Sequence, residues 1–336
     1  MTPDRDAFDA ALVPGMRARL AESYARFRAA EAEAIKHLVP PGEGGAAGNY
    51  RRRDCPCCRH GSAGLAPVLR AHGLELLDCP GCGLTYTRQV LDEAADAARY
   101  AASGLDVEML RLRGSGPYLE LETLRDRYYM ARLGAGGFGP GRLLEVGSGT
   151  GVLLLEAARA GWQALGMEPG RAAAQLAVER GTNTLCGWFP QDLPPGAEAF
   201  DAVAVLDVLE HFADPLGFLA QLKARLAPGG RLLVQVPNWD SLLVQLEGAR
   251  SSVVAPGHWS YFTPASLAAL LARAGFRTLS LETVVSELDR IAGFPPEQVA
   301  ATLAALRPAA PPWPLDATAL HGLGLGYKLL GVFQPG

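Results

Sequence analysis

The sequence predicts an α/β protein whose second half forms a mostly parallel, doubly wound sheet. From Arg142 onward, short apolar stretches alternate with amphipathic stretches of helical length, an order typical of parallel sheets with helices on both faces. A glycine-rich turn joins the first of these strands to the first helix. That turn lies at the carboxyl edge of the predicted sheet, where open α/β sheets bind their ligands.

The composition is that of a globular protein and disfavours several functional classes. The 336 residues are 49% hydrophobic and 20% charged, with mean hydropathy +0.09, and the length favours two domains. No stretch approaches the roughly 18 apolar residues of a membrane span, and the start MTPDRDAFDA is unlike a secretory signal. The net charge of −4 and pI of about 5.9 disfavour nucleic-acid binding. We therefore expect a cytoplasmic protein without membrane partners, with a homo-oligomer left open.

Breaks in composition divide the chain into four parts. Residues 1–45 carry apolar positions at helical spacing and precede a glycine-rich linker, which predicts an N-terminal helical segment. Residues 46–90 contain five of the six cysteines, and residues 91–140 are predicted to form a helical lid or linker that ends in GAGGFGPG. Residues 141–336 are predicted to form the α/β domain.

Each element of the α/β part is predicted from its apolar period and its flanking breakers. The predicted strands are 142–146, 163–168, 200–207, 231–237, 277–285 and a closing strand over 326–334. The predicted helices are 152–160, 170–181, 215–230 and 263–276. A proline-rich segment over about 293–314 separates the last two strands and is expected to pass over one edge of the sheet.

The segment 143–158, LLEVGSGTGVLLLEAA, contains the glycine-rich turn and carries the strongest functional signal. Glycines at 147, 149 and 151 allow a sharp turn and the close approach of a ligand to the backbone. A dinucleotide fingerprint would need glycine at position 152, where this chain has Val152. The acidic Glu145 before the turn suits a cofactor that carries an ammonium and a sulfonium. Glu168, at the end of the next strand, is placed to accept hydrogen bonds from ribose hydroxyls.

Two C-x-x-C pairs stand 20 residues apart in the cysteine-rich part: Cys55 with Cys58, and Cys79 with Cys82. Such pairs typically bind a structural zinc ion as four thiolates. A redox dithiol and free cysteines are the alternatives, and His60 and His72 are reserve ligands. The intervening segment is predicted to form a hairpin. Cys57 is left over as a spare thiol, and Cys186 is expected in the core.

The motifs of residues 140–285 resemble those of class I S-adenosylmethionine-dependent methyltransferases, in particular the small-molecule group that includes the ubiquinone-pathway enzymes. The matching segments are the glycine loop, FDAVAVLDVLEHFADP over 200–215, LAPGGRLLV over 226–234, and HWSYFTP over 258–264, followed by Gly275-Phe276. The resemblance implies a Rossmann-like, seven-stranded methyltransferase sheet. The N-terminal zinc-ribbon resembles that of sugar and glycan-pathway methyltransferases.

The resemblance also implies S-adenosylmethionine as the cofactor, with zinc in a structural role. The implied cofactor-binding residues are Glu145, Gly147, Ser148, Gly149, Thr150, Gly151, Glu168, Pro169, Trp188 and Asp207. Trp188 occupies a position where the family often has an acid that binds adenine, so adenine contact through stacking, or through Asp192, is expected instead.

Methyl transfer is an in-line displacement and needs a base only where the acceptor must lose a proton. His211 and His258 are the candidate bases; the alternative for each is a structural hydrogen bond that orients its loop. Trp259 and Tyr261 either stack on the acceptor or anchor the loop. Tyr128 and Tyr129 are expected as core or lid packing.

Three functions compete. The first is a methyltransferase for a small-molecule acceptor, such as a sugar, a glycan intermediate or a secondary metabolite, with O-methylation favoured. The second is an RNA methyltransferase that docks nucleic acid through the zinc-ribbon, where Arg51, Arg52, Arg53 and Arg59 form a basic cluster. The third is a non-catalytic, cofactor-binding partner protein. The acidic chain disfavours the second, and the intact glycine loop disfavours the third.

Overall fold

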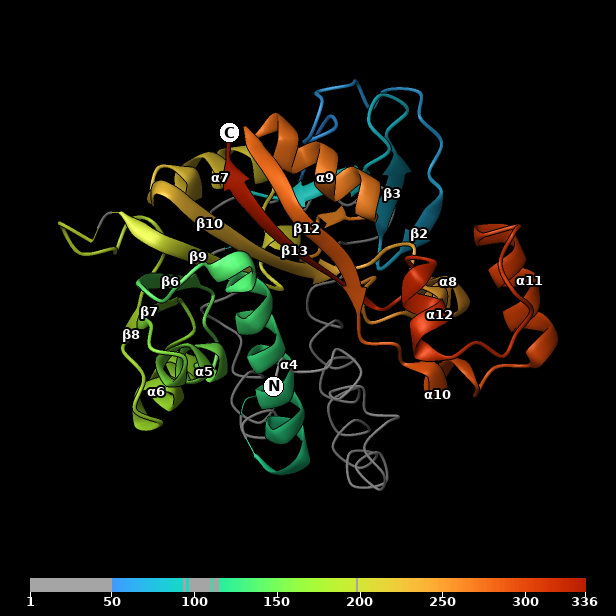
Figure 1. Cartoon of the computed structure of the whole chain (residues 1–336). Coiled ribbons are helices and arrows are strands. Elements are labelled where there is room, and N and C mark those ends of the chain that lie inside the picture. Colours follow the sequence, from blue (N-terminus) through green and yellow to red (C-terminus); the bar gives the residue numbers. More distant parts are fainter. Residues whose placement is uncertain (1–49, 93–94, 97–109, 111–114, 198) are drawn as a thin grey trace.

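The computed structural model describes residues 50–92, 95–96, 110, 115–197 and 199–336 (Figure 1). The helical segment predicted over residues 1–45 lies outside the described residues, as does most of the region between 91 and 115. Within the described ranges, no helix has both the length and the hydropathy of a membrane span.

A seven-stranded sheet forms the centre of the molecule, in the order β12-β13-β10-β9-β6-β7-β8. The strands are β6 (Arg142–Val146), β7 (Gln163–Glu168), β8 (Thr184–Cys186), β9 (Phe200–Leu206), β10 (Leu226–Pro237), β12 (Phe276–Val284) and β13 (Lys328–Pro335). The pairs from β10 through β9, β6 and β7 to β8 are parallel. Only β13 runs against its two neighbours. The doubly wound, seven-stranded fold predicted from the sequence is therefore confirmed.

Helices cover both faces of this sheet because side chains alternate along each buried strand. Leu144 and Val203 face a core shared with α7 (Pro215–Lys223) and α9 (Pro264–Arg273), whereas Leu143 and Ala202 face a second core shared with α4 (Gly116–Leu133) and α5 (Val152–Arg159). Figure 1 shows α7 and α9 on one side of the sheet and α4 and α5 on the other. Helix α6 (Arg171–Glu179) and the short turns η3 (Ala135–Gly137) and η4 (Leu209–His211) also lie around the sheet.

One helix is shorter than predicted. The sequence predicted a helix over 215–230, but α7 ends at Lys223, and β10 begins at Leu226 by pairing with Phe200. Pro228 has no N–H to donate, and Gly229 adopts φ +79°, so neither continues a helix. The register of β10 shifts between Leu226 and Arg231 to accommodate this segment.

The cysteine-rich part forms two small sheets. β1 (Tyr50–Arg52) pairs with β5 (Gln89–Leu91), and β2 (Leu69–Ala71), β3 (Leu74–Asp78) and β4 (Thr85–Thr87) form an antiparallel meander. The predicted hairpin is thus confirmed as β2 and β3. The fourth strand of the meander sheet is β11 (Ser260–Tyr261), which comes from the segment after β10. A strand from the second half of the chain therefore completes a sheet of the cysteine-rich part.

The segment between β12 and β13 contains three helices: α10 (Leu288–Ile291), α11 (Pro296–Leu306) and α12 (Ala317–Gly322). They pack with α8 (Leu242–Glu247), which precedes the turn η5 (Gly248–Arg250), around a separate apolar cluster that includes Leu246, Val299 and Leu320. Figure 1 shows this group beyond the end of β12, as expected for an excursion at an edge.

Candidate active site

A cavity of about 450 Å³ lies at the carboxyl ends of the central strands. Its lining includes the loop after β6, Asp207 after β9, and Gln235 and Pro237 at the end of β10. Parts of α4, of the segment between β10 and β11, and of the β12–β13 connection complete the wall. Both the location and the size are those of a small-molecule site in an α/β protein.

The glycine loop has the predicted shape. Gly147 adopts φ +74°, and a Cβ at this position would lie 2.5 Å from Val208 Cγ2. Gly151 adopts φ +79° at the start of α5, and a Cβ there would lie 2.9 Å from Thr182 Cγ2. A side chain at either position would be both strained and crowded, which explains why glycine is needed. Of the predicted cofactor residues, Glu145, Gly147, Ser148, Gly149, Thr150 and Asp207 line the cavity, and Gly151 does not.

Glu145 presents a buried carboxyl to this cavity. It is 4% exposed, and its Oε2 has no hydrogen-bond partner among the described residues. Burial, with smaller contributions from Asp126 and Glu168, raises the pKa of Glu145 well above its usual value. Asp126 on α4 also lines the cavity, and burial likewise raises its pKa. A buried acid with an unpartnered oxygen fits a cationic ligand, as the sequence predicted for the ammonium of a sulfonium cofactor.

Glu168 braces the glycine loop. Its Oε2 accepts a hydrogen bond from the Gly149 N–H at 2.9 Å, and its Oε1 accepts one from the Gly170 N–H at 2.7 Å. Glu168 and Pro169 are outside the cavity lining. Trp188 is also outside it, 41% exposed, and its backbone N–H donates to Asp192 Oδ2 at 2.7 Å. The structure thus places the glycine loop at the cavity and Trp188 outside it. Asp192 accepts a hydrogen bond within the turn that contains Trp188.

Asp207 lies directly after β9 with φ +53°, a strained conformation for a residue other than glycine. Its Oδ1 accepts hydrogen bonds from Lys328 Nζ at 2.5 Å and from Gln235 Nε2 at 2.9 Å. Burial alone would lower the pKa of Lys328, but Asp207, Tyr327 and Glu210 outweigh it and raise that pKa. The sequence analysis missed Lys328. Its contact with Asp207 follows from the pairing of β13 with β10, which the sequence alone does not show.

The two candidate bases, His211 on η4 and His258 before β11, lie against each other in the cavity. Their ring centroids are 4.6 Å apart in an edge-on arrangement. His211 Nδ1 is 2.8 Å from the Gly257 carbonyl oxygen, and His258 Nδ1 is 2.9 Å from the Val253 carbonyl oxygen. Because a carbonyl only accepts, each Nδ1 carries the proton and each Nε2 is the basic nitrogen. Burial, followed by the charge of His211, lowers the pKa of His258 well below 6.5.

Glu210 is a second residue that the sequence analysis missed. It is 1% exposed, and burial, then Asp207, raises its pKa well above the usual value. A carboxylate oxygen of Glu210 and ring nitrogens of His211 and His258 lie within 4.8 Å of one another. This set can share a proton, and its donor types also suit a divalent cation. The signal in the sequence was the run from Asp207 to His211, which places three titratable groups at the end of one strand.

The aromatic residues divide between wall and packing. Tyr129 lines the cavity, whereas the Tyr128 hydroxyl donates to Glu282 Oε2 at 3.1 Å. Trp259 and Tyr261 are 1% and 3% exposed and pack in clusters with apolar residues of the cysteine-rich part. The anchoring interpretation of these two residues therefore fits the structure better than stacking on an acceptor.

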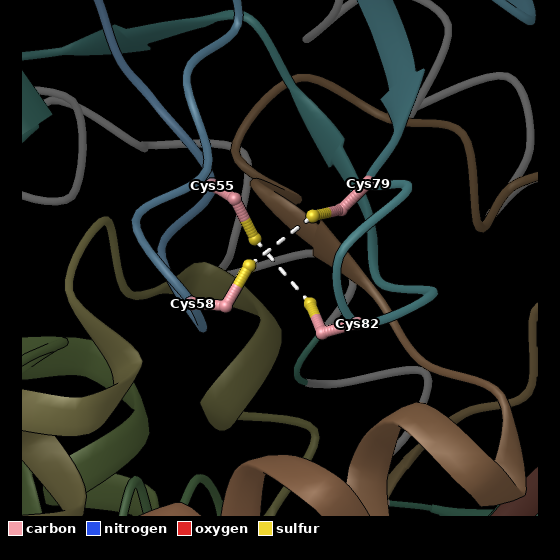
Figure 2. A group of neighbouring side chains, drawn as sticks. All are labelled: Cys55, Cys58, Cys79 and Cys82. Carbon is pink, nitrogen blue, oxygen red and sulfur yellow. Dashed lines mark hydrogen bonds between the residues drawn. The ribbon is translucent and has the colours of Figure 1, made fainter.

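The four cysteines of the C-x-x-C pairs converge on one point (Figure 2). All four sulfur atoms lie within 4.8 Å of one another; Cys55 and Cys82 Sγ are 3.5 Å apart, and Cys58 and Cys79 Sγ are 3.3 Å apart. A tetrahedron with zinc–sulfur bonds of about 2.3 Å has edges of about 3.8 Å, so the geometry fits a zinc ion.

The structure also places the two cysteines outside the C-x-x-C pairs, Cys57 and Cys186, and one arginine of the predicted basic cluster, Arg53. Cys57 is buried beside the four-cysteine cluster. The expectation that Cys186 lies in the core is wrong: it is exposed at the end of the edge strand β8, which has a neighbour on one side only. Arg53, included in the predicted basic cluster, is 8% exposed, and its guanidinium donates to backbone carbonyls. It therefore does not belong to a solvated basic surface.

Comparison with known proteins agrees with this geometry. Residues 118–281 match the family described as a methyltransferase domain. A ubiquinone biosynthesis O-methyltransferase of Bradyrhizobium sp. (strain ORS 278) is 34% identical over 116 residues, which is 32% of this chain and 45% of that protein. A tRNA U34 carboxymethyltransferase of Idiomarina loihiensis is 28% identical over 215 residues, 56% of this chain and 64% of that protein. The chain thus spans about half to two thirds of the length of these curated relatives.

Among solved structures, a 1,6-didemethyltoxoflavin-N1-methyltransferase of Burkholderia thailandensis is similar at 18% identity and a TM-score of 0.46, over 78% of this chain and 94% of that one. The fold, the glycine loop and the matched family agree. Residues 118–281 of this chain therefore form a methyltransferase domain.

Proposed function

We propose that this protein transfers the methyl group of S-adenosylmethionine to a small-molecule acceptor, with a hydroxyl oxygen as the favoured target. The observation that carries the proposal is one cavity with two unlike walls: an acidic wall at the glycine loop and a wall that holds His211 and His258. When bound, S-adenosylmethionine supplies an electrophilic methyl group on a sulfonium. The chain's own residues have to bind the cofactor, orient the acceptor and remove the proton from its hydroxyl group.

The glycine loop and its acidic neighbours form the cofactor half of the site. Glu145 and Asp126 are assigned to the positive end of the cofactor, because both are buried carboxyls on the cavity wall. Glu168 fixes the loop by its bond to Gly149 and is the proposed acceptor for the ribose hydroxyls. Pro169, Trp188 and Asp207 remain proposed cofactor contacts, although Pro169 and Trp188 are outside the cavity lining.

The histidine pair forms the acceptor half. An acceptor hydroxyl would donate its proton to a histidine Nε2 as its oxygen attacks the methyl group, and the sulfonium leaves as a neutral thioether. His258 suits this role because its lowered pKa keeps the ring neutral near pH 7. His211 holds the neighbouring position and contributes to that lowering. Suitable acceptors are sugars, glycan intermediates and hydroxylated secondary metabolites, whose polar groups match a wall of mixed charge.

The cysteine-rich part is proposed as a structural zinc-ribbon, held by Cys55, Cys58, Cys79 and Cys82. Four ligands close the coordination sphere and leave no position for a substrate. Thiolate ligation is consistent with a cytoplasmic location. The division into residues 1–45, 46–90, 91–140 and 141–336 remains our proposed domain layout, with β11 as a shared strand.

A transfer assay tests this proposal. The purified protein is incubated with S-adenosylmethionine labelled in the methyl group and with panels of hydroxylated sugars, phenols and bulk tRNA, and a His258→Gln variant serves as the matched control. We expect label in a small molecule, and about 10²-fold or more lower transfer by the variant, which is the range for loss of a general base. Label in tRNA alone would favour the RNA alternative, which the tRNA-modifying relative keeps open.

A further inference from the structure

The cysteine-rich part and the two histidine loops share a hydrogen-bonded interface. Strand β4 pairs with β11, so that Tyr86 is opposite Ser260 and Thr85 is opposite Tyr261. The Thr87 N–H extends this ladder by donating to the Trp259 carbonyl at 3.0 Å. Because Trp259 directly follows His258, the ladder begins next to one of the two cavity histidines.

Arg53 spans this interface from the side of the cysteine cluster. Its Nε donates to the Thr87 carbonyl at 3.0 Å, its Nη1 donates to the Ala213 carbonyl at 2.8 Å, and its Nη2 donates to the Trp259 carbonyl. Ala213 lies two residues after His211, and Arg53 itself lies two residues before Cys55. One buried guanidinium therefore bonds to β4 and to both histidine-bearing loops.

The two loops are also bonded to each other. The Trp259 N–H donates to the Glu210 carbonyl at 2.8 Å, and the Gly257 carbonyl accepts from His211 Nδ1. A displacement of either loop would therefore change the hydrogen bond that fixes the His211 tautomer. Arg53 adds bonds to both of these loops and to β4, and we expect its three bonds to fix the separation of the two loops.

We propose that Arg53 is a positioning residue: it uses the cysteine-rich part as a rigid support and sets the relative placement of His211 and His258. This inference rests on the proposed function, in which these two histidines form the acceptor wall. Arginine suits the task because its planar fork donates in several fixed directions, whereas lysine offers a single nitrogen. Without the guanidinium, the carbonyls of Thr87, Ala213 and Trp259 would each lose one donor, and the loops would relax to recover these bonds.

Two Arg53 substitutions and one matched control test this role. Arg53→Met keeps length and burial but removes all side-chain donors, and Arg53→Lys restores a single donor nitrogen. Arg59→Gln is the control, because Arg59 belongs to the same cysteine-rich part and bonds Asp214, next to Ala213, through an exposed pair at 3.2 Å. All variants are purified as full chains with their bound metal, and the metal content of each is measured.

The readout is the ring ¹⁵N spectrum of the histidines, recorded with and without S-adenosylhomocysteine, with assignments from His211→Gln and His258→Gln. In Arg53→Met we expect the signals of His211 and His258 to shift and broaden. The signals of His321, which bonds Thr283 Oγ1 at 3.0 Å in another part of the fold, should stay in place. Arg53→Lys should shift the same two signals less, and Arg59→Gln should match the wild type.

The inference is overturned if His211 and His258 give wild-type signals in folded Arg53→Met; should that variant not fold, wild-type signals in Arg53→Lys overturn it. The affinity for S-adenosylhomocysteine, measured by calorimetry, should change less than about twofold in Arg53→Met. A wild-type protein that binds no S-adenosylhomocysteine would defeat the proposed function, while the histidine spectra would still decide the role of Arg53.

Discussion

At the scale of single residues, the assignment of the cofactor depends most on Glu145. Its position before the glycine turn was predicted from the sequence. That its Oε2 has no hydrogen-bond partner among the described residues is known only from the structure. A buried carboxyl whose pKa is raised should ionise more readily when a cation binds beside it, because the opposite charge favours its charged form.

We therefore expect S-adenosylmethionine binding to release protons and to tighten as the pH rises through the raised pKa of Glu145. Glu145→Gln should weaken binding about tenfold or more, as expected for a lost charge-assisted hydrogen bond. It should also reduce the proton release. Calorimetry in buffers of different ionisation enthalpy measures both quantities. Glu179→Gln, at an exposed position on α6, is the control. Unchanged proton release in Glu145→Gln would show that another group ionises.

His258 gives a pH-dependent prediction whose sign is fixed by its lowered pKa. The unfolded chain takes up a proton near pH 6.5 while the folded ring stays neutral, so the free energy of unfolding should fall as the pH decreases through 6.5. Ring ¹⁵N titration should show His258 neutral at pH 6.5. In His258→Gln, the loss of stability on acidification should be smaller than in the wild type. Half protonation of His258 near pH 6.5 would refute the lowered pKa.

At the scale of elements, the sequence predicted most of the central strands because their apolar runs and glycine stops are local signals. The helix that begins at Pro215 was predicted too long. Its apolar pattern continues to Leu226, but in the structure Leu226 belongs to β10 and pairs with Phe200 of β9. The pairing of β11 with β4 could not be predicted, because a two-residue strand has no periodicity and its partner lies about 170 residues earlier in the chain.

The cysteine-rich element gives a prediction of its own. Purified protein should contain one zinc ion per chain, and Cys79→Ser should lose it and unfold at a lower temperature. The reason is that structural zinc contributes about 10–16 kcal/mol to the folding of small zinc domains. Cys186→Ser is the matched control, because Cys186 is exposed and lies outside the four-cysteine cluster. Metal analysis and thermal unfolding provide the readouts, and full zinc content in Cys79→Ser would contradict the assigned ligands.

At the scale of the whole molecule, the cavity is assembled from parts that are far apart in the sequence. The glycine loop and the histidines were predicted as candidates, since their local motifs resemble a known family. Lys328 and Glu210 were not, because their roles depend on long-range pairing and on burial, which a single sequence does not reveal. Arg53 was interpreted as part of a basic surface, and only the fold shows that it is enclosed between two loops.

Calorimetric titration of the wild-type protein with S-adenosylhomocysteine, and in parallel with NAD, tests the central claim most directly. A cavity with an acidic glycine-loop wall and without the dinucleotide fingerprint should bind S-adenosylhomocysteine at one site per chain and leave NAD unbound. Binding of NAD, or binding of neither molecule, would contradict the account of this cavity as a methyl-donor site.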